Sequence, residues 1–183
     1  MKDRYELRLS GSGGQGLILA GLILAEAAGI YDNKNVIQTQ SYGPEARGGA
    51  SKSEVVISES EIDYPKVTHP DLLLALTQEA CDKYSGDLRE EGILIVDSFR
   101  VKRVPSPKAF SIPITEMAKK EVGRELVTNI VALGIIAELT GVVSPEAVKR
   151  AVLDRVPKGT EKLNKKALEV GFRIGREKKE VSE

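Results

Sequence analysis

The stretch Ser10-Gly-Ser-Gly-Gly-Gln-Gly16 is a glycine-rich turn, and the apolar run Leu17 to Ala28 follows it directly. Before the turn, Arg4 to Leu9 alternates polar and apolar side chains, which is the period of a half-buried strand. Four glycines within six residues permit positive φ angles and leave the backbone open to a close neighbour. The sequence here predicts a strand, a glycine loop and a helix, an arrangement that suits an anion at the first helical N–H groups.

Gly11, Gly13 and Gly16 also satisfy the G-x-G-x-x-G pattern of dinucleotide-binding folds. Those folds place an acidic residue at the end of the second strand, where it holds the ribose. The next candidate strand, Asn35 to Gln40, runs into Ser-Tyr instead, and Asp32 falls in the turn before it. The missing acid weakens the dinucleotide interpretation, and the glycines also suit close packing of helix on strand without any ligand.

Composition limits the classes of protein that this chain can represent. Its 183 residues, 41% hydrophobic and 30% charged, suit a single globular domain over residues 1–183 with a sizeable core. The 27 basic and 27 acidic side chains give no net charge, so we expect no nucleic-acid partner. The apolar run Leu17 to Ala28 is too short for a membrane span, and we expect a cytoplasmic protein. Many charges and few methionines favour a thermophilic source.

Cysteine and histidine are too scarce for several kinds of site. Cys81 alone can form no internal disulfide, no zinc site made only of cysteines and no iron–sulfur cluster held by four thiolates. His69 is the one histidine, and no Ser-His-Asp arrangement can be drawn around it. We therefore expect no metal site in this chain.

A second unusual loop is Ser41-Tyr-Gly-Pro-Glu-Ala-Arg-Gly-Gly49, between the strand-like segments Val36 to Thr39 and Ser53 to Ser58. It places Tyr42, Glu45 and Arg47 within six residues on a backbone bent by glycines and a proline. Such loops contact ligands or partners while a sheet holds their ends. Arg47 is suited to pair bidentately with a phosphate or a carboxylate. The alternative is that Glu45 and Arg47 are solvated surface charges.

The middle of the chain has the pattern of a parallel sheet. Asp71 to Thr77 and Gly92 to Ser98 are continuous apolar runs, as in strands buried on both faces, and Thr77 is placed to cap a helix over Gln78 to Tyr84. Because ligands gather at the carboxyl ends of such strands, Thr77, Asp97 and Ser98 are weak site candidates.

The last third is expected to be mainly helical. Phe110 to Ile114 is a short strand, after which Thr115 is placed to cap a helix through Lys120. Three further helices are expected: Leu126 to Leu139 stopped by Gly141, one from Ser144-Pro145 to near Val156, and Thr160 to Arg176 with a frayed tail.

Three segments together resemble the gamma subunit of 2-oxoacid:ferredoxin oxidoreductases: Gly11-Ser-Gly-Gly-Gln-Gly16, Ser41-Tyr-Gly-Pro-Glu-Ala-Arg-Gly-Gly49 and Val55-Val-Ile-Ser58. The resemblance covers nearly the whole chain and continues through Pro70-Asp71 and through Asn129 with Ala132-Leu-Gly134. The context of Ala46 and Ser51 is most similar to the 2-oxoglutarate branch. Pyruvate, branched-chain 2-oxoacid and indolepyruvate complexes are the alternatives.

The resemblance implies a cytoplasmic hetero-oligomer that converts a 2-oxoacid and coenzyme A into acyl-CoA, CO₂ and reduced ferredoxin. Thiamine diphosphate, magnesium and iron–sulfur clusters are then expected on partner subunits, named alpha, beta and, where present, a ferredoxin-like delta. This chain has one cysteine and no Gly-Asp-Gly, in line with that division. It is expected to be a non-catalytic subunit on the coenzyme A side, with a three-layer α/β/α fold, a mostly parallel Rossmann-like sheet and a helical C-terminal part.

The residues expected at a cofactor-binding site lie in the two loops: Gly11, Ser12, Gly13, Gly14, Gln15, Gly16, Tyr42, Glu45 and Arg47. If Arg4 to Leu9 and Val36 to Thr39 are neighbouring parallel strands, both loops emerge at one carboxyl edge of the sheet and converge on one anion. The competing hypothesis is a stand-alone Rossmann-like protein that binds a nucleotide at the glycine loop.

Overall fold

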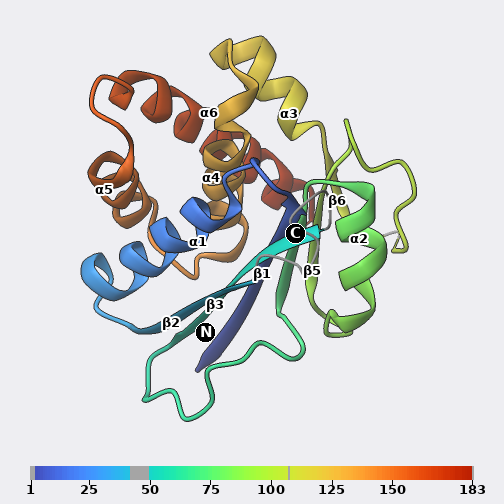
Figure 1. The fold of residues 1–183 in the computed structure, drawn as a ribbon, viewed down its shortest axis with the longest axis vertical. Helices are drawn as coiled ribbons and strands as arrows, with labels where there is room; N and C mark the ends of the chain where they lie inside the picture. Colours follow the sequence, from blue (N-terminus) through green and yellow to red (C-terminus); the bar gives the residue numbers. More distant parts are fainter. Residues whose placement is uncertain (1–2, 42–49, 107, 183) are drawn as a thin grey trace.

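The structure is a computed structural model that describes residues 3–41, 50–106 and 108–182. Its centre is a six-stranded sheet in the order β2-β3-β1-β4-β5-β6 (Figure 1). The strands are β1 (Arg4–Ser12), β2 (Asn35–Ser41), β3 (Ala50–Ser58), β4 (Leu72–Ala75), β5 (Ile93–Asp97) and β6 (Phe110–Ile112). The six strands predicted from the sequence are therefore all present, with ends shifted by up to three residues.

The sheet is mostly parallel, as expected, because β1, β4, β5 and β6 pair in parallel. The expected pairing of β1 with β2 is wrong: β3 lies between them and runs antiparallel to both. Short connections favour antiparallel pairing of consecutive strands, and β3 suits an interior position because Val55, Val56 and Ile57 are buried on both of its faces. β1 and β2 still run in the same direction, one strand apart.

Helices cover the two faces of the sheet unequally (Figure 1). One face carries α1 (Leu17–Glu26), α4 (Thr128–Thr140), α5 (Pro145–Arg155) and α6 (Glu161–Ser182), and the larger hydrophobic core lies beneath them. The other face carries α2 (Gln78–Tyr84) over a smaller core that includes Leu73, Cys81 and Val96. The three-layer α/β/α arrangement with a helical C-terminal part is thus confirmed.

Several local signals hold in the structure. Thr77 Oγ1 caps α2 by accepting from Ala80 N at 3.2 Å, and Ser144 caps α5 by accepting from Ala147 N at 3.2 Å. Gly141 ends α4 with φ of 63°, in the left-handed region that favours glycine.

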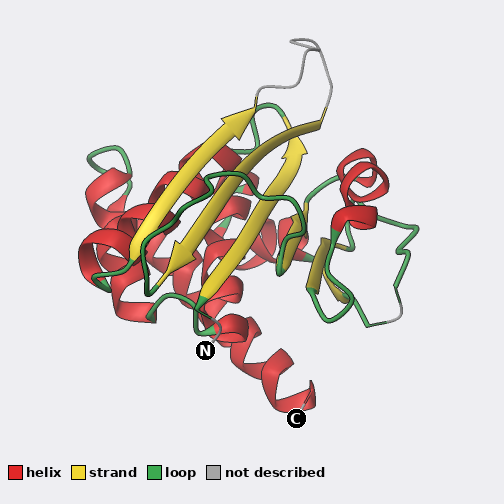
Figure 2. Ribbon diagram, turned by 90° about the horizontal axis from the view of Figure 1, so that it is seen from below, coloured by secondary structure: helices red, strands yellow, loops and turns green. Residues whose placement is uncertain are grey.

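Other helix boundaries differ from the prediction. Helix α1 ends at Glu26 and passes into a π-helical turn over Ala27–Tyr31. Thr115 is no cap, because α3 (Ile114–Met117) begins one residue earlier, after Pro113. The tail after Arg176, expected to be frayed, continues α6 to Ser182, and Figure 2 shows this helix extending beyond the body of the domain.

Helices α4 and α6 cross in backbone contact at glycines. A Cβ atom added at Gly171 would lie 2.2 Å from the carbonyl oxygen of Val131, and one at Gly134 would lie 2.7 Å from that of Leu168. Real Cβ atoms essentially never come this close to backbone atoms. Only glycine fits at these two residues. The close crossing of the helices holds α4 behind the glycine loop.

The polar side of β1 is buried rather than solvated. Arg8, 3% exposed, donates to Glu54 Oε1 at 2.7 Å and to Asp87 Oδ2 at 2.5 Å, and its guanidinium lies 5.2 Å from the centre of the Tyr84 ring. In Figure 2 the segment after β3 passes in front of this half of the sheet, and Arg8 donates to the Val67 carbonyl of that segment. The layer that covers β1 on the α2 side is therefore held by ion pairs as well as by apolar contacts.

Candidate functional site

The glycine loop joins the end of β1 to the start of α1. Gly14 and Gly16 have φ of 85° and 71°, which only glycine adopts without strain. Gln15 closes the turn, because its Oε1 accepts from Ser12 N at 2.8 Å and its own N–H donates to the Ser12 carbonyl at 3.4 Å. The N-cap of α1 is Gly16, which has no side chain to accept from the first N–H groups of the helix.

The four glycines fall into two groups with different roles. A Cβ atom at Gly11 would lie 2.3 Å from Gln15 Oε1, and one at Gly16 would lie 2.5 Å from Asn129 Nδ2, so neighbouring side chains fill the space beside both glycines. At Gly13 and Gly14, in contrast, no atom of the described residues lies within 4 Å of an added Cβ. The sequence left close packing and ligand access as alternatives for this loop. In the structure Gly11 and Gly16 are closely packed, whereas Gly13 and Gly14 leave access for a ligand.

Asn129, at the start of α4, fixes the loop from behind. Its side chain is buried, its Nδ2 donates to the Gly16 carbonyl at 3.0 Å and its Oδ1 accepts from Ile130 N. The sequence pointed to Asn129 only through the family resemblance and gave it no role. A contact across more than a hundred residues has no local pattern that could have revealed it.

A recess of about 180 Å³ opens beside the exposed part of the loop. It is lined by Gly14, Gln15, Thr115, Glu125, Leu126 and Thr128. A second hollow of about 240 Å³ adjoins it, with mainly apolar walls that include Leu19, Ile130 and Leu163. Leu126 borders both hollows and is 79% exposed, which is unusual for a large apolar side chain in this protein. Glu125 and Leu126 were not predicted as site residues: Leu126 was expected to begin the buried helix, but α4 begins at Thr128 and leaves Leu126 exposed.

Glu125, on the rim of the recess, is held by two cations. Its Oε2 pairs with Lys119 at 2.7 Å and its Oε1 pairs with Arg100. The hydrogen bond from Lys119, followed by that from Arg100, holds the pKa of Glu125 below its ordinary value. The carboxylate therefore stays charged into acidic solution.

The charge state of Glu125 can be measured by NMR titration. The contribution of its ion pairs is present above the ordinary glutamate pKa of about 4.3 and is lost as the pH falls through the lowered pKa. We expect Lys119→Met to raise the pKa of Glu125, because that change removes the strongest cause of the shift. A carboxyl resonance that titrates at the same pH in both proteins would contradict this ion-pair assignment.

Thr77, Asp97 and Ser98, the weaker site candidates, make hydrogen bonds within the fold. Asp97 is fully buried, and its carboxylate accepts from Thr115 Oγ1 and from the N–H groups of Thr115 and Phe99. Thr77 caps α2, and the carbonyl of Ser98 accepts from Lys102 Nζ. Asp32, considered as a ribose acid, instead accepts from Ser144 N and Oγ, each at 2.6 Å, ahead of α5.

The second predicted loop, with Tyr42, Glu45 and Arg47, lies outside the described residues. Its neighbours are placed by the sheet: Ser41 ends β2, Ala50 begins β3, and Ala50 lies opposite Ser12 at the end of β1. Both chain ends of the loop are therefore at the carboxyl edge that carries the glycine loop. The prediction that the two loops leave one edge holds, although the strands are not neighbours.

Among the described residues, no three His, Cys, Asp or Glu side chains come together in a way that could hold a metal ion. None of the helices in that part of the chain has the length and apolar character needed to cross a membrane. Burial raises the pKa of the Cys81 thiol, which disfavours the reactive thiolate.

Fold and site define an α/β domain with a glycine loop at the carboxyl edge of a mostly parallel sheet. The sequence profile of the family described as pyruvate ferredoxin/flavodoxin oxidoreductase matches residues 6–174. The chain belongs to this family, as the two loops predicted.

Alignments with similar proteins cover nearly the whole of this chain. The 2-oxoglutarate synthase subunit KorC of Methanocaldococcus jannaschii is 52% identical over 97% of both chains. A crystal structure of a keto/oxoacid ferredoxin oxidoreductase gamma subunit from Geobacter sulfurreducens is 58% identical, covers 94% of this chain and 96% of its own, and superimposes with a TM-score of 0.86. The 2-oxoglutarate:ferredoxin oxidoreductase of Magnetococcus marinus shares the fold at 22% identity and a TM-score of 0.84, and there the fold occupies 32% of a longer chain.

Proposed function

We propose that this chain is the gamma subunit of a 2-oxoglutarate:ferredoxin oxidoreductase, in which it contributes to the coenzyme A side of the active site. The observation that carries the proposal is the 52% identity to a 2-oxoglutarate synthase subunit over 97% of both chains. The alternative substrates are pyruvate, branched-chain 2-oxoacids and indolepyruvate. Relatives named for ketoisovalerate and for pyruvate are less similar to this chain, at 36% and 32% identity.

Thiamine diphosphate, magnesium and the iron–sulfur clusters are proposed to reside on alpha, beta and delta partners, with ferredoxin as the electron acceptor. One buried cysteine cannot supply four thiolates, which supports this division. The same fold forms about a third of a longer oxidoreductase chain in Magnetococcus marinus. That arrangement supports a role for this domain packed against other parts of such an enzyme, rather than as a stand-alone nucleotide-binding protein.

Within the complex, we assign an anionic group of coenzyme A to the exposed half of the glycine loop. Gly13 and Gly14 leave space for close approach at the start of α1, and the recess and the mainly apolar hollow lie beside them. An uncapped helix N-terminus favours a phosphate through its N–H groups and its dipole. Arg47, in the loop between Ser41 and Ala50, is proposed to add a guanidinium, with Tyr42 and Glu45 beside it in sequence.

Replacing Gly13 by valine tests the glycine loop as a binding surface. No atom of the described residues lies within 4 Å of a Cβ atom added at Gly13, so the valine side chain should change the unfolding midpoint little. It would occupy the position that a phosphate approaches, and we expect the KM for coenzyme A in the assembled complex to rise at least about tenfold, in proportion to the loss of one charge-assisted hydrogen bond. An unchanged KM in a stable variant would contradict the assignment.

Arg47→Ala separates ligand binding from assembly. If Arg47 contacts a phosphate, coenzyme A should bind more weakly by about 1.5–3 kcal/mol while the complex keeps its stoichiometry. The matched control is Arg150→Ala, which removes an exposed arginine from α5 and should leave the KM unchanged. Normal affinity in a fully assembled Arg47→Ala complex would defeat the ligand role, and failure to assemble would place Arg47 at a subunit interface instead.

The isolated chain is expected to show no 2-oxoacid oxidation with a viologen acceptor, because the cofactor sites are assigned to partners. Activity should appear only when the partner subunits are added. Turnover by the purified chain alone, free of partner subunits, would refute the subunit proposal and favour the stand-alone alternative.

A further inference from the structure

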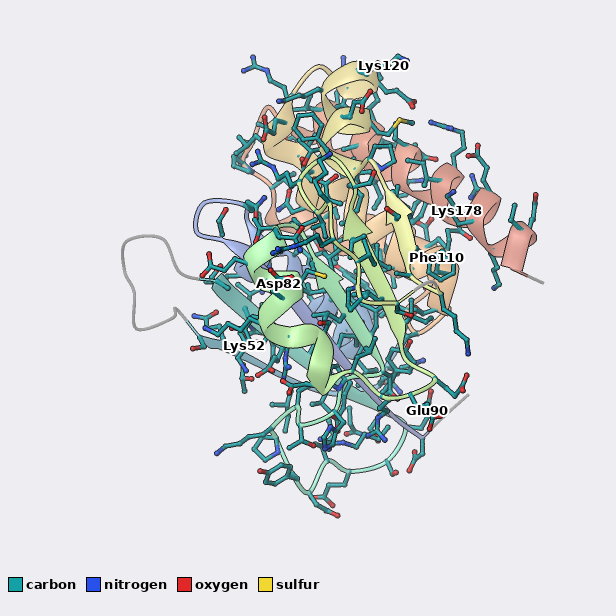
Figure 3. All side chains as sticks on the ribbon, turned by 90° about the vertical axis from the view of Figure 1, so that its right-hand side faces the viewer. Lys52, Asp82, Glu90, Phe110, Lys120 and Lys178 are labelled. Atoms are coloured by element: carbon teal, nitrogen blue, oxygen red, sulfur yellow. The ribbon has the colours of Figure 1, made fainter. Side chains whose placement is uncertain are left out.

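A surface at the β5 and β6 end of the sheet is strongly basic. From Ser98 to Ile114 the chain carries four cationic side chains and no carboxylate. Residues 98–125 together contain seven cations and three carboxylates, for a net charge of +4, so the rest of this neutral chain carries −4. Figure 3 looks onto this side of the molecule, with Asp82 on α2, Phe110 on β6 and Lys120 labelled.

The segment that carries these charges is held rigidly by two side chains. Asp97 accepts from Phe99 N, and its carbonyl accepts from Arg100 N and Val101 N at 2.9 and 2.8 Å. Gln78 Oε1 accepts from the N–H groups of Lys102 and Arg103 at 2.8 and 3.0 Å. Val101 is buried between the two groups. The side chains of Phe99, Arg100, Lys102 and Arg103 are therefore exposed on a backbone that is already ordered.

Apolar side chains accompany the charges. Phe99 is 42% exposed, and Lys119 Nζ lies 5.1 Å from the centre of its ring. Leu126, the exposed residue next to the recess, follows Glu125, which pairs with Arg100 and Lys119. Aromatic and arginine side chains are enriched in the central parts of protein interfaces. The surface made by Phe99, Arg100, Lys102, Arg103, Lys119 and Leu126 is called the basic face below.

We propose that the basic face docks onto an acidic surface of a partner subunit, with Phe99 and Leu126 as the apolar contacts. This inference rests on the proposed function, because it takes the partner from the same oxidoreductase complex. Charge complementarity defines the partner: the basic face has four cations against the two carboxylates paired with them, Asp82 and Glu125, and this remaining positive charge fits a carboxylate-rich surface. The face adjoins the glycine-loop recess through Glu125 and Leu126, so a subunit docked there would also border the proposed coenzyme A site.

The pattern of charges favours a protein over a nucleic acid. Asp82 pairs with Arg103 at 2.9 Å, and Glu125 lies between Arg100 and Lys119. These carboxylates would repel a continuous phosphate backbone, whereas a protein surface can place its own charges to match a mixed pattern. The ordered backbone lowers the entropy cost of docking, since little of the segment has to be fixed on binding.

The test compares two charge-reversed variants that change the net charge equally. Lys102→Glu with Arg103→Glu alters the basic face, and Lys165→Glu with Lys166→Glu alters an exposed turn of α6. Each purified chain is titrated with the remaining subunits of the complex by isothermal calorimetry, at about 0.05, 0.15 and 0.5 M salt, which span the range of strong to weak screening. Circular dichroism checks that both variants fold.

We expect the basic-face variant to bind at least about tenfold more weakly at 0.15 M salt, with a flatter salt dependence than the unmodified chain. Phe99→Ala should weaken binding at every salt concentration, and the α6 variant should bind like the unmodified chain. Equal affinity and equal salt dependence for both charge-reversed variants would overturn the inference while leaving the proposed function intact. No binding by the unmodified chain would instead refute the proposed function, and with it the inference. Binding of a short duplex DNA that is lost only in the basic-face variant, with subunit binding unchanged, would assign the face to nucleic acid and overturn the docking proposal.

Discussion

Replacing Arg8 by methionine is expected to lower the free energy of unfolding by about 3–5 kcal/mol, the cost of breaking a buried ion pair. Methionine keeps most of the apolar stem but removes the guanidinium that bonds Glu54, Asp87 and the Val67 carbonyl. Glu54 is 8% exposed and would be left with Lys52 as its ion-pair partner. Chemical denaturation of the two proteins measures the difference.

Two further variants show whether the loss comes from the unpaired charge. Arg103→Met removes an arginine whose side chain is 79% exposed, and it should change stability by no more than about 0.5 kcal/mol. Arg8→Met combined with Glu54→Met should recover most of the loss, because apolar replacements of a buried pair are often neutral. A single Arg8→Met change that costs less than about 1 kcal/mol would show that the buried network contributes little.

Gly171→Ala is expected to destabilise the protein by about 2–3 kcal/mol, although alanine is the better helix former. Helix propensity alone would give a gain of up to about 1 kcal/mol. The added methyl group, however, would lie 2.2 Å from the Val131 carbonyl oxygen, and two packed helices must separate to admit it. The unfolding midpoint should fall by roughly 4–12 °C at the usual 2–4 °C per kcal/mol for a chain of this size.

Gly86→Ala is the control, because no atom of the described residues lies within 4 Å of an added Cβ and its φ is not in the left-handed region. Its effect should lie between neutral and a gain of about 1 kcal/mol, the range for a glycine replaced without strain. If Gly171→Ala behaved like Gly86→Ala, helices α4 and α6 would not be in the close contact described.

Local patterns in the sequence predicted where helices and strands begin and end better than they predicted which strands pair in the sheet. The hydroxyl of Thr77 and the Ser144-Pro145 pair each mark a helix start through one short-range hydrogen bond, and both caps are confirmed. The place of β3 between β1 and β2 depends on pairing across the whole first third of the chain. A strand with both faces apolar suits several interior positions, so the pattern of Val55 to Ile57 could not decide among them.

The candidate site was predictable only where it depends on residues close together in the sequence. A glycine-rich turn is visible in the sequence, but which glycines pack and which stay open depends on Asn129 and Leu76, far along the chain. Asp97 looked like a site residue because it ends a buried strand, yet its carboxylate is used by the backbone around it. The basic segment was not predicted, because zero net charge over the whole chain conceals a local excess of cations, and the hydrogen bonds that order it come from Gln78, outside the segment.

The unequal covering of the sheet has a consequence for how the chain folds as it is made. Leu7 and Leu9 of β1 belong to a core whose other wall includes α4 and α6, which begin only at Thr128 and Glu161. Most of the apolar face of the sheet therefore stays uncovered until synthesis is nearly complete. Contacts between such distant segments slow folding, and exposed strands invite association in the meantime. A nascent chain stalled before α4 should need a chaperone to stay soluble. Resistance to protease should appear only when α6 has left the ribosome.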